Sequence, residues 1–417
     1  MVSLCFYFQV HQPYRIRKYS VFDIGNKKDY FEDRSGTKLD NKWIVDKVAG
    51  KCYLPTNAVL LELLKKHPEF KISFSLSGVF LEQLEEFAPD VLKSFQDLVE
   101  TGQVEILSET YYHSLSFLYD KEEFRAQVEL HRDLVKRLFG AQPTVFRNTE
   151  LIYNNELAGE IEAMGYKGVI AEGADHLLGW RSPNFLYKPV GTERIKVLLK
   201  NYKLSDDVAF RFSNRGWKDW PLTVPKYVQW LNSINGSGEV INLFMDYETF
   251  GEHQWEDTGI FEFLRHLPEE FLKHPDNNFK TPSEVVDAYP TRGEYDAHSF
   301  ISWADLERDL SAWKGNEIQD AAMDRIYDIG ERVKLTGNDK LIHRWRKLQT
   351  SDHFYYMCTK WFSDGDVHKY FNPYESPYEA FIAYMNVLQD LEMEVNDILK
   401  ERGFVKDGIL VEPRINL

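Results

Sequence analysis

Short apolar runs rich in β-forming residues alternate with helical patterns through the first 300 residues, and this alternation restricts the possible folds more than any other feature. Each apolar run has the length and residue types of a buried strand. Because successive strands joined through helices form parallel sheets, we predict an α/β fold that closes most simply into a barrel. The runs are residues 2–10, 70–76, 103–107, 144–146, 168–171, 196–199 and 239–245, with 299–302 as a candidate closing strand.

The pattern changes near Trp303, after which helical periodicity continues with few strand signals. We therefore predict two domains, a barrel over residues 1–300 and a helical region over residues 301–417. A polar stretch from Tyr14 to Tyr53 follows the first strand. Loops of this length in compact domains are usually functional lids or disordered segments, so a lid is one prediction for it.

The chain is acidic, with 50 Lys and Arg against 66 Asp and Glu and a net charge of −16. This balance argues against a nucleic-acid partner, because phosphates need a cationic surface, and it disfavours anionic membranes likewise. The scattered Cys5, Cys52 and Cys358 indicate neither a disulfide framework nor a cysteine metal site. The N-terminal residues lack a basic leader and an apolar run of membrane-spanning length, so we expect a cytoplasmic protein.

One carboxylate stands at a point where barrel enzymes place their chemistry. The uncharged run 144–146 is followed at once by polar residues that include Arg147 and Glu150, and then by a helical pattern that begins near Asn154. Glu150 is therefore predicted at the C-terminal end of a strand, which is the catalytic end of α/β barrels. The alternative is a rim carboxylate that pairs with Arg147.

A second strand ends in acids in the same way, since Asp246 and Glu248 follow the run 239–245. Acids at the ends of two strands of one barrel face the same mouth. Cleavage of a glycosidic bond needs one carboxyl group that is protonated and one that is ionised, and burial with like-charge proximity can hold a pair in those states. A purely structural role for Asp246 or Glu248 is the alternative.

Other polar groups follow predicted strands, and they leave two interpretations open. Histidines and acids at one mouth could bind zinc or another divalent ion, although no HxxxH or HExxH spacing is present. Histidines that hydrogen-bond a sugar are equally compatible with the pattern. No Gly-rich phosphate loop or dinucleotide fingerprint occurs. The residues concerned are His11, Gln12, Glu105, His113, His253 and His298.

Aromatic residues make up 15% of the chain, and several Trp residues fall outside the predicted strands. Sugar rings present CH faces that stack on indole, so a carbohydrate site would use some of these residues. The alternative is that most of them pack the barrel against the helical region. They are Trp180, Trp217, Trp220, Trp255, Trp303 and Trp313.

Five motifs occur in order, and together they resemble those of glycoside hydrolase family 57, most closely its α-amylase-like branch. The motifs are HQP, GQVEIL with YYHSL, FRNTELIYNNE, FMDYETFGEH, and SWADLERDLSAWKGN with TSDHFYYM, spread from His11 to Met357. The resemblance implies an incomplete (β/α)7 barrel and a C-terminal helical region that contributes to the substrate cleft. It implies a retaining mechanism on α-glucans or maltooligosaccharides, with no metal and no organic cofactor.

By motif position, the resemblance implies that Glu150 is the nucleophile and Asp246 the general acid/base. Where the family's transferase branch has an acidic residue, this chain has His113, which argues against a plain glucanotransferase. The candidate substrate-binding residues are His11, Gln12, Glu105, His113, Glu248, His253, Trp303 and Asp352.

The sequence thus predicts an α-amylase-like hydrolase that acts on maltooligosaccharides, starch or glycogen. A 4-α-glucanotransferase is the nearest alternative, because the same covalent intermediate serves both reactions. A metal-dependent polysaccharide deacetylase or mannosidase and a non-catalytic carbohydrate-binding protein are the alternatives from other classes. A retaining enzyme is expected to hold its two carboxyl groups about 5–5.5 Å apart.

Overall fold

The chain forms two compact units, each built from several segments of the sequence. The computed structural model describes residues 2–360, 372–406 and 409–410. The barrel unit comprises Met1–Gln12, Val45–Tyr111 and Arg125–Ala304, and the helical unit comprises Pro13–Ile44, Tyr112–Phe124 and Asp305–Leu417. Two segments that the sequence prediction assigns to the barrel domain, Pro13–Ile44 and Tyr112–Phe124, therefore belong to the helical unit.

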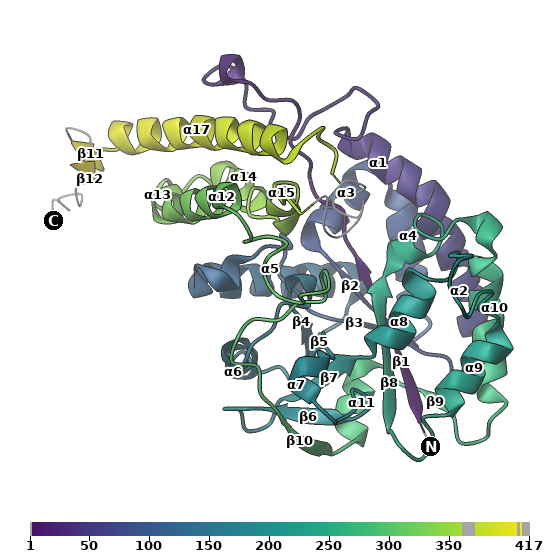
Figure 1. The fold of residues 1–417 in the computed structure, drawn as a ribbon. Coiled ribbons are helices and arrows are strands. Elements are labelled where there is room, and N and C mark those ends of the chain that lie inside the picture. Colours follow the sequence, from purple (N-terminus) through teal and green to yellow (C-terminus); the bar gives the residue numbers. More distant parts are fainter. Residues whose placement is uncertain (1, 361–371, 407–408, 411–417) are drawn as a thin grey trace. The chain divides into compact units, whose positions relative to one another are not determined.

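Seven parallel strands form the barrel, and each of the seven predicted runs overlaps one of them. β1 pairs with β2 and β8, β2 pairs with β3, and β5 pairs with β4 and β7 (Figure 1). The predicted α/β class is confirmed. The strands are β1 (Ser3–Val10), β2 (Ile72–Leu76), β3 (Val104–Ile106), β4 (Val145–Arg147), β5 (Gly168–Glu172), β7 (Lys196–Lys200) and β8 (Val240–Asp246).

Two short connections join these strands into a ring. An isolated parallel bridge between Ser108 and Phe146 continues β3 into β4. On the other side, β7 and β8 lie in different sheets and are joined through Asn242, whose carbonyl accepts from the Asn201 N–H at 2.9 Å and whose amide donates to the Leu199 carbonyl at 2.9 Å. The closure between β7 and β8 is thus weaker than a full ladder, which suits an incomplete barrel.

The barrel strands carry apolar side chains on both faces, because both faces are buried. Side chains alternate along β1, so Cys5 and Tyr7 join the interior cluster with Leu198 and Phe244. The next residue, Phe8, instead stacks against rings outside this cluster, including Phe74 at 5.7 Å. This burial of both faces explains why residues 2–10 are a nearly continuous apolar run and not an alternating one.

Helices cover the barrel strands, and Figure 1 shows α2, α9 and α10 along the side of β1 and β8. The helices of this part of the chain are α1 (Asn41–Val48), α2 (Leu54–Lys66), α3 (Gly78–Phe87), α4 (Pro89–Val99), α5 (Lys121–Phe139), α6 (Asn155–Ala163), α7 (Asp175–Leu178), α8 (Tyr202–Ala209), α9 (Val224–Asn232), α10 (Ile260–Leu272) and α11 (Pro282–Ala288).

The strand predicted at 299–302 is wrong. Only Ile301 of that segment forms a bridge, an isolated antiparallel one with Tyr153. The additional strands are β6 (Leu186–Pro189), which pairs antiparallel with β7, and β10 (Thr291–Tyr295), which pairs with β6. A two-residue strand, β9 (Asn278–Phe279), pairs with the start of β1.

The helical unit is organised around its longest helix, α17, which contacts α12, α13 and α14 (Figure 1). Ser376 caps the start of α17 by accepting from the Glu379 N–H, and Trp345 of α14 is fully buried. The helical periodicity predicted to start near Trp303 forms no helix over residues 303–313, where turns occur and Asp305 and Arg308 have positive φ angles. The helices are α12 (Glu317–Asp328), α13 (Gly330–Leu335), α14 (Asp339–Lys347), α15 (Ser351–Tyr355) and α17 (Pro377–Glu401).

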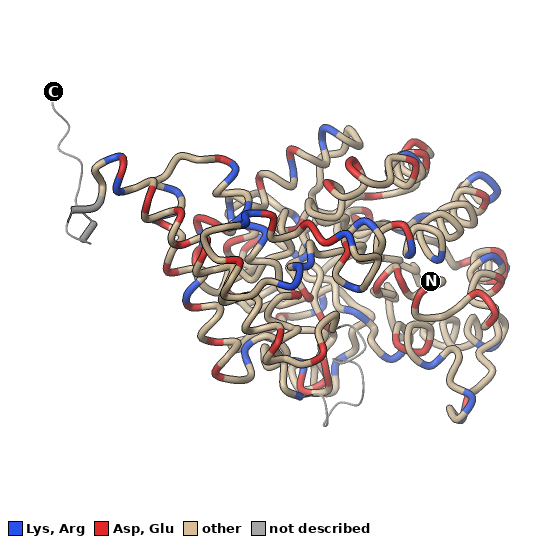
Figure 2. The backbone as a smooth tube through the Cα atoms, turned by 90° about the horizontal axis from the view of Figure 1, so that it is seen from above, with Lys and Arg blue, Asp and Glu red and all other residues tan. Residues whose placement is uncertain are grey.

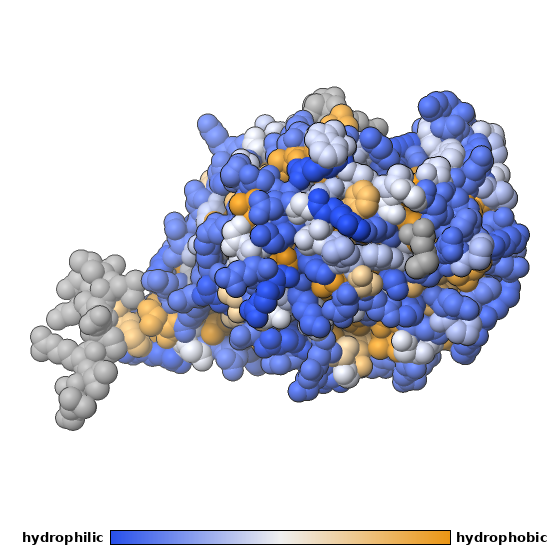
Figure 3. Space-filling model, turned by 90° about the horizontal axis from the view of Figure 1, so that it is seen from below, coloured by the Kyte–Doolittle hydropathy of each residue, from blue (hydrophilic) through white to orange (hydrophobic). Residues whose placement is uncertain are grey.

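Basic and acidic residues alternate along the backbone, as Figure 2 shows. The face in Figure 3 is mostly hydrophilic, with apolar side chains in small groups. Among the described residues, no helix has the length and apolar character needed to cross a membrane.

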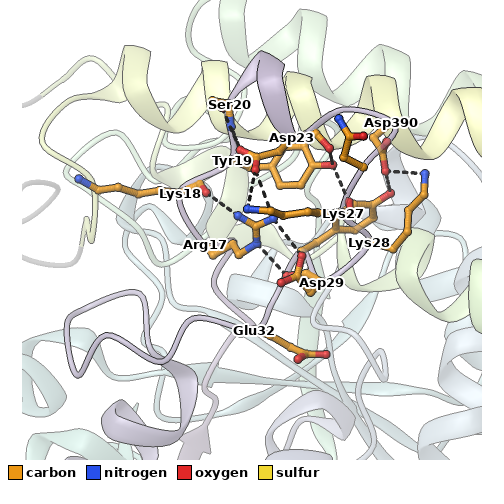
Figure 4. A network of polar contacts seen from close by, with 12 residues as sticks. Arg17, Lys18, Tyr19, Ser20, Asp23, Lys27, Lys28, Asp29, Glu32 and Asp390 are labelled. Carbon is orange, nitrogen blue, oxygen red and sulfur yellow. Dashed lines mark hydrogen bonds and ion pairs between the residues drawn. The ribbon is translucent and has the colours of Figure 1, made fainter.

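One buried carboxylate of α17 contacts the segment Pro13–Ile44 at three residues within the helical unit. Asp390 accepts from the Gly25 N–H at 2.5 Å, the Tyr30 hydroxyl at 2.5 Å and the Lys28 ammonium at 2.8 Å (Figure 4). Burial alone would raise the pKa of Asp390, but these three donors hold it below its usual value. The segment, which includes most of the predicted lid, is therefore bonded to α17 through an ionised group.

We expect Asp390→Asn to lower the free energy of unfolding by about 2–3 kcal/mol at neutral pH, because it weakens hydrogen bonds to a buried charge. Since the folded-state pKa of Asp390 is lowered, its stabilising effect is lost as pH falls through that pKa, and the difference from wild type should shrink in acid. Thermal melting from pH 3 to 7 measures this. In limited proteolysis of Asp390→Asn, the segment Pro13–Ile44 should be cleaved before the rest of the chain.

The matched control is Asp397→Asn, which changes an exposed carboxylate of the same helix. It should melt as the wild type does. Equal melting of the two variants at pH 7 would show that Asp390 does not anchor the segment.

Candidate active site

The C-terminal ends of the barrel strands bring the principal predicted acids to one end of the barrel. Glu150 lies in the short 3-10 turn η4 (Thr149–Leu151) that directly follows β4, and Asp246 is the last residue of β8. Asp246 is in register with Gln9 of β1, and His11 and Gln12 come directly after that strand. Because the barrel strands are parallel, these residues share one end of the unit.

Glu150 has an unusual backbone. Its φ and ψ are 57° and 26°, and Leu151 also has a positive φ of 49°. Left-handed backbone at residues other than Gly costs free energy, and it persists where surrounding contacts impose it. Here the Asn148 side chain bridges the turn by donating to the Ile152 carbonyl at 2.9 Å.

A second segment, residues 297–303, holds the same turn in place. Tyr153 and Ile301 exchange two backbone hydrogen bonds of 2.9 Å, and the Asn155 amide side chain accepts from the Ala297 N–H at 2.9 Å. The segment predicted as a strand thus has another role, since it fixes the turn that carries Glu150.

Trp303, the end of this segment, orients the carboxyl group of Glu150. Its indole Nε1–H donates to Glu150 Oε2 at 2.8 Å. Two cations lie against the same ring, with Arg147 Cζ at 5.3 Å and Lys200 Nζ at 5.2 Å from the ring centroid. These distances are within the range of cation–π attraction, so the indole is held firmly and its N–H is polarised toward the carboxylate.

Lys200 ends β7 and is only 5% exposed. Its ammonium donates to Asp206 Oδ1 at 3.1 Å and lies 3.8 Å from Glu172 Oε2. Burial alone would lower the pKa of Lys200, but the nearby carboxylates, first among them Asp206, raise it above its usual value. Lys200 is therefore a fixed positive charge at this end of the barrel.

Arg147, at the end of β4, is fully buried beside a buried acid. Its NH1 lies 3.9 Å from Glu109 Oε2, and both side chains have no exposed surface. The alternative prediction pairs Arg147 with Glu150, and the structure places Glu109 next to the guanidinium.

Glu248 is a buried carboxyl group with an altered charge state. Tyr53 donates its hydroxyl to Glu248 Oε1 at 2.5 Å, and Gln12 Nε2 lies 3.5 Å from the same oxygen. Burial, with the negative charge of Asp246 as the second cause, raises the pKa of Glu248 to about 8. At neutral pH Glu248 is therefore mostly protonated.

We expect Glu248→Gln to become more stable relative to the wild type as pH rises from 5 to about 8. The folded wild type binds more protons than the unfolded chain in this range, so its stability falls with pH, whereas glutamine resembles the protonated acid at every pH. The slope is at most about 1.4 kcal/mol per pH unit. Melting temperatures measured from pH 5 to 9 test this.

The exposed Glu256→Gln, in η6 (Glu256–Thr258), serves as the control and should show no such trend. A constant difference between Glu248→Gln and wild type at every pH would contradict the assigned protonation state.

The two histidines near these acids have defined surroundings. His11 Nδ1 and the Ser77 hydroxyl are 2.6 Å apart, and the backbone N–H of His253 donates to the backbone carbonyl of Glu248 at 2.9 Å. Burial is the main cause that lowers the pKa of His253 to about 4, so its imidazole is neutral at neutral pH. A neutral imidazole can both donate and accept a hydrogen bond, which suits contact with sugar hydroxyls.

The prediction that Glu105 lines this site is corrected by the structure. Its carboxylate Oε2 accepts from the Ser283 N–H at 2.9 Å, in the first turn of α11, and Glu105 is level with Ser73 in the ladder between β2 and β3. A buried acid within a strand needs a polar partner, and the Ser283 N–H is that partner. Burial raises the pKa of Glu105.

Two further predicted residues belong to the helical unit. His113 is buried with a φ of 51°, and its carbonyl accepts from the Ser351 N–H at 2.9 Å. Asp352 lies in α15 next to Ser351. His113 and Asp352 thus share one corner of that unit, while the other predicted site residues lie in the barrel unit.

Three residues of the site were missed from the sequence. Glu172 and Lys200 end the predicted strands 168–171 and 196–199, so the strand-end rule that selected Glu150 should have selected them too. Tyr53 carried no signal, because only the path of the chain between β1 and β2 brings it to Glu248.

His298, one of the histidines considered for a metal site, follows β10. Its side chain is 81% exposed, and its Nε2 lies 2.9 Å from Asp296 Oδ2. Within residues 2–360, 372–406 and 409–410, no group of three or more His, Cys, Asp or Glu side chains is arranged to hold a metal ion.

Comparison with known proteins decides the family. A family model described as glycosyl hydrolase family 57 matches residues 5–298. The chain belongs to glycosyl hydrolase family 57. This confirms the resemblance found in the motifs, and it makes the protein a glycoside hydrolase.

The relatives of this family 57 chain differ in their names and their lengths. A protein named "Putative alpha-amylase" from Methanocaldococcus jannaschii is 47% identical over 97% of this chain and 87% of its own length. A 4-alpha-glucanotransferase from Thermococcus litoralis is 24% identical over 60% of this chain, and that match spans only 37% of the relative.

Solved structures of family 57 enzymes share the fold. A branching enzyme from Thermococcus kodakaraensis has a TM-score of 0.71 at 14% identity, covering 98% of this chain and 92% of its own. The α-amylase AmyC from Thermotoga maritima has a TM-score of 0.59 at 13% identity, covering 96% of each chain. These likenesses support the incomplete (β/α)7 barrel with a C-terminal helical domain.

Proposed function

We propose that this family 57 chain is a retaining, α-amylase-like glycosidase acting on α-glucans, with Glu150 as nucleophile and Asp246 as general acid/base. The observation that carries the proposal is the strained turn of Glu150, whose carboxylate Trp303 orients at the barrel end that also carries Asp246. The names of the relatives, α-amylase and 4-α-glucanotransferase, support the substrate class.

In the first step a Glu150 oxygen forms a bond to the anomeric carbon while the bond from that carbon to the leaving oxygen breaks. Asp246 gives its proton to the leaving oxygen. In the second step Asp246 takes a proton from a water molecule, whose oxygen attacks the anomeric carbon and releases Glu150. Two inversions give net retention of the anomeric configuration.

The surroundings suit this division of roles. Trp303 donates to Glu150, and such a bond favours the ionised carboxylate that attack requires. Asp246 and Glu248 do not both ionise at neutral pH, so this pair of carboxyl groups keeps one proton at the same end of the barrel as Glu150. The acid role of Asp246 requires that this proton lie on Asp246 when the leaving oxygen departs.

A 4-α-glucanotransferase is the second candidate, because a sugar hydroxyl can replace water in the second step. It is favoured by the similarity to the T. litoralis enzyme. The presence of His113 in place of an acidic residue of the transferase branch favours hydrolysis.

The test is a product analysis with maltoheptaose in the presence of a chelator, combined with NMR of the anomer formed first. We expect shorter sugars that appear first as the α-anomer. A ladder of sugars longer than the substrate would identify a transferase. Appearance of the β-anomer first would rule out retention, and loss of activity in chelator would favour a metal-dependent enzyme such as a deacetylase or mannosidase. No action on any α-glucan would favour a carbohydrate-binding protein.

A further inference from the structure

Lys200 is connected to the proposed nucleophile through a chain of direct contacts. Its ammonium lies 5.2 Å from the ring centroid of Trp303, and the Trp303 N–H donates to Glu150 at 2.8 Å. The ammonium of Lys200 contacts Asp206 of α8 and Glu172 of β5. These two carboxylates fix the position of the lysine side chain.

Lys200 also lies beside the strand that ends in Asp246. The backbone after Lys200 is bonded to β8, since the Asn201 N–H donates to the Asn242 carbonyl at 2.9 Å. Lys200 and Asp246 are the last residues of β7 and β8, the two strands that this contact joins. One fixed cation therefore lies at the end of the barrel that carries both proposed catalytic carboxyl groups, and it is linked to Glu150 through the indole of Trp303.

The proposed reaction moves a negative charge between those two groups. Before the first step Glu150 is ionised and Asp246 carries a proton. Afterwards Glu150 is an uncharged ester and Asp246 is the carboxylate. A cation that is already in place stabilises the charge at both positions without reorganisation, and preorganised charge of this kind is a large source of rate enhancement.

We propose that Lys200 is a positioning residue that holds Trp303 against Glu150 and serves as the stationary counter-charge while the negative charge passes from Glu150 to Asp246. This inference rests on the proposed function of the two carboxyl groups. The charged groups around Lys200 and its ring partner are Glu109, Arg147, Glu172, Asp206 and Asp246.

The test compares Lys200→Met and Lys200→Arg with the wild type, using maltoheptaose from pH 4 to 9. We expect kcat of Lys200→Met to fall about 10²-fold, as for misplacement of a reacting group, with KM changed less than about threefold. The acidic limb of the kcat/KM profile should move to higher pH, because Glu150 ionises less readily without the cation. Lys200→Arg keeps the charge and should recover at least about tenfold of the loss.

Lys196→Met is the matched control. Lys196 begins the same strand, and its ammonium donates to the carbonyls of Val286 at 2.6 Å and Tyr289 at 2.7 Å, contacts of a purely structural kind. It should lower the melting temperature without moving the pH profile. If Lys200→Met does not fold, the neutral variant Lys200→Gln takes its place, with the same expected fall in kcat and shift of the acidic limb.

The outcomes separate this inference from the proposed function. A wild type that cleaves no α-glucan contradicts the proposed function itself. A wild type that cleaves, together with Lys200→Met whose acidic limb is unshifted or whose loss equals that of Lys196→Met, overturns the role of Lys200 alone.

Discussion

Cleavage of maltoheptaose should fall by at least about 10⁴-fold in Glu150→Gln, since a neutral amide cannot attack the anomeric carbon. The fold should persist, because the amide oxygen can still accept from the Trp303 N–H that now bonds Glu150 Oε2. The strained turn is fixed by backbone contacts with residues 297–303, which the substitution leaves intact. The expected result is thus a folded, inactive protein.

Initial rates and thermal melting of purified Glu150→Gln measure this. Glu156→Gln, which changes an exposed acid in the first turn of α6, is the control and should keep wild-type activity. A sharper version uses Glu150→Ala with azide, which should form a β-linked glycosyl azide because one displacement inverts the anomeric carbon. Activity of Glu150→Gln within tenfold of wild type would falsify the assignment.

Asp246→Asn should lose about 10²–10⁴-fold activity on maltoheptaose, the usual contribution of general acid–base catalysis. A sugar leaving group needs a proton, whereas a nitrophenolate does not, so the loss should be much smaller for a nitrophenyl α-maltooligoside. The substitution also removes the charge that helps to raise the pKa of Glu248, which should move toward its usual value.

The measurement is the ratio of kcat/KM for the two substrates, in wild type and in Asp246→Asn. That ratio should shift strongly toward the nitrophenyl substrate in the variant, and the basic limb of the pH profile should disappear. An equal loss on both substrates would assign Asp246 to binding or structure instead of proton transfer.

The strands of the barrel could be predicted because both of their faces are buried. Residues 2–10 and 239–245 are mostly apolar on both faces of the strand, a pattern that can be recognised without knowledge of the neighbouring strands. The segment 299–302 has similar residues, but its Ile301 bonds with Tyr153 in a turn, a contact set by tertiary structure. Local preference does not reveal such contacts.

Acids that directly follow a strand could be assigned to the catalytic end of the barrel from the sequence. The position of an acid within a strand could not. Glu150 and Asp246 follow their strands, so their place is determined by sequence order alone. Glu105 lies within β3, where alternation gives the direction of its side chain and not its depth in the barrel. Its partner, Ser283, is 178 positions away in the chain, and no local pattern could indicate it.

The contact between Asp390 and the Gly25 N–H has a consequence for how the chain is made. These two residues are 365 positions apart. At the usual rate of ~5–20 residues per second, the ribosome needs roughly 20–70 s to reach the anchor after it has released the segment that the anchor holds. Residues 13–44 therefore emerge among the first and are fixed among the last, so nascent chains should carry this segment in a protease-sensitive form until α17 is complete.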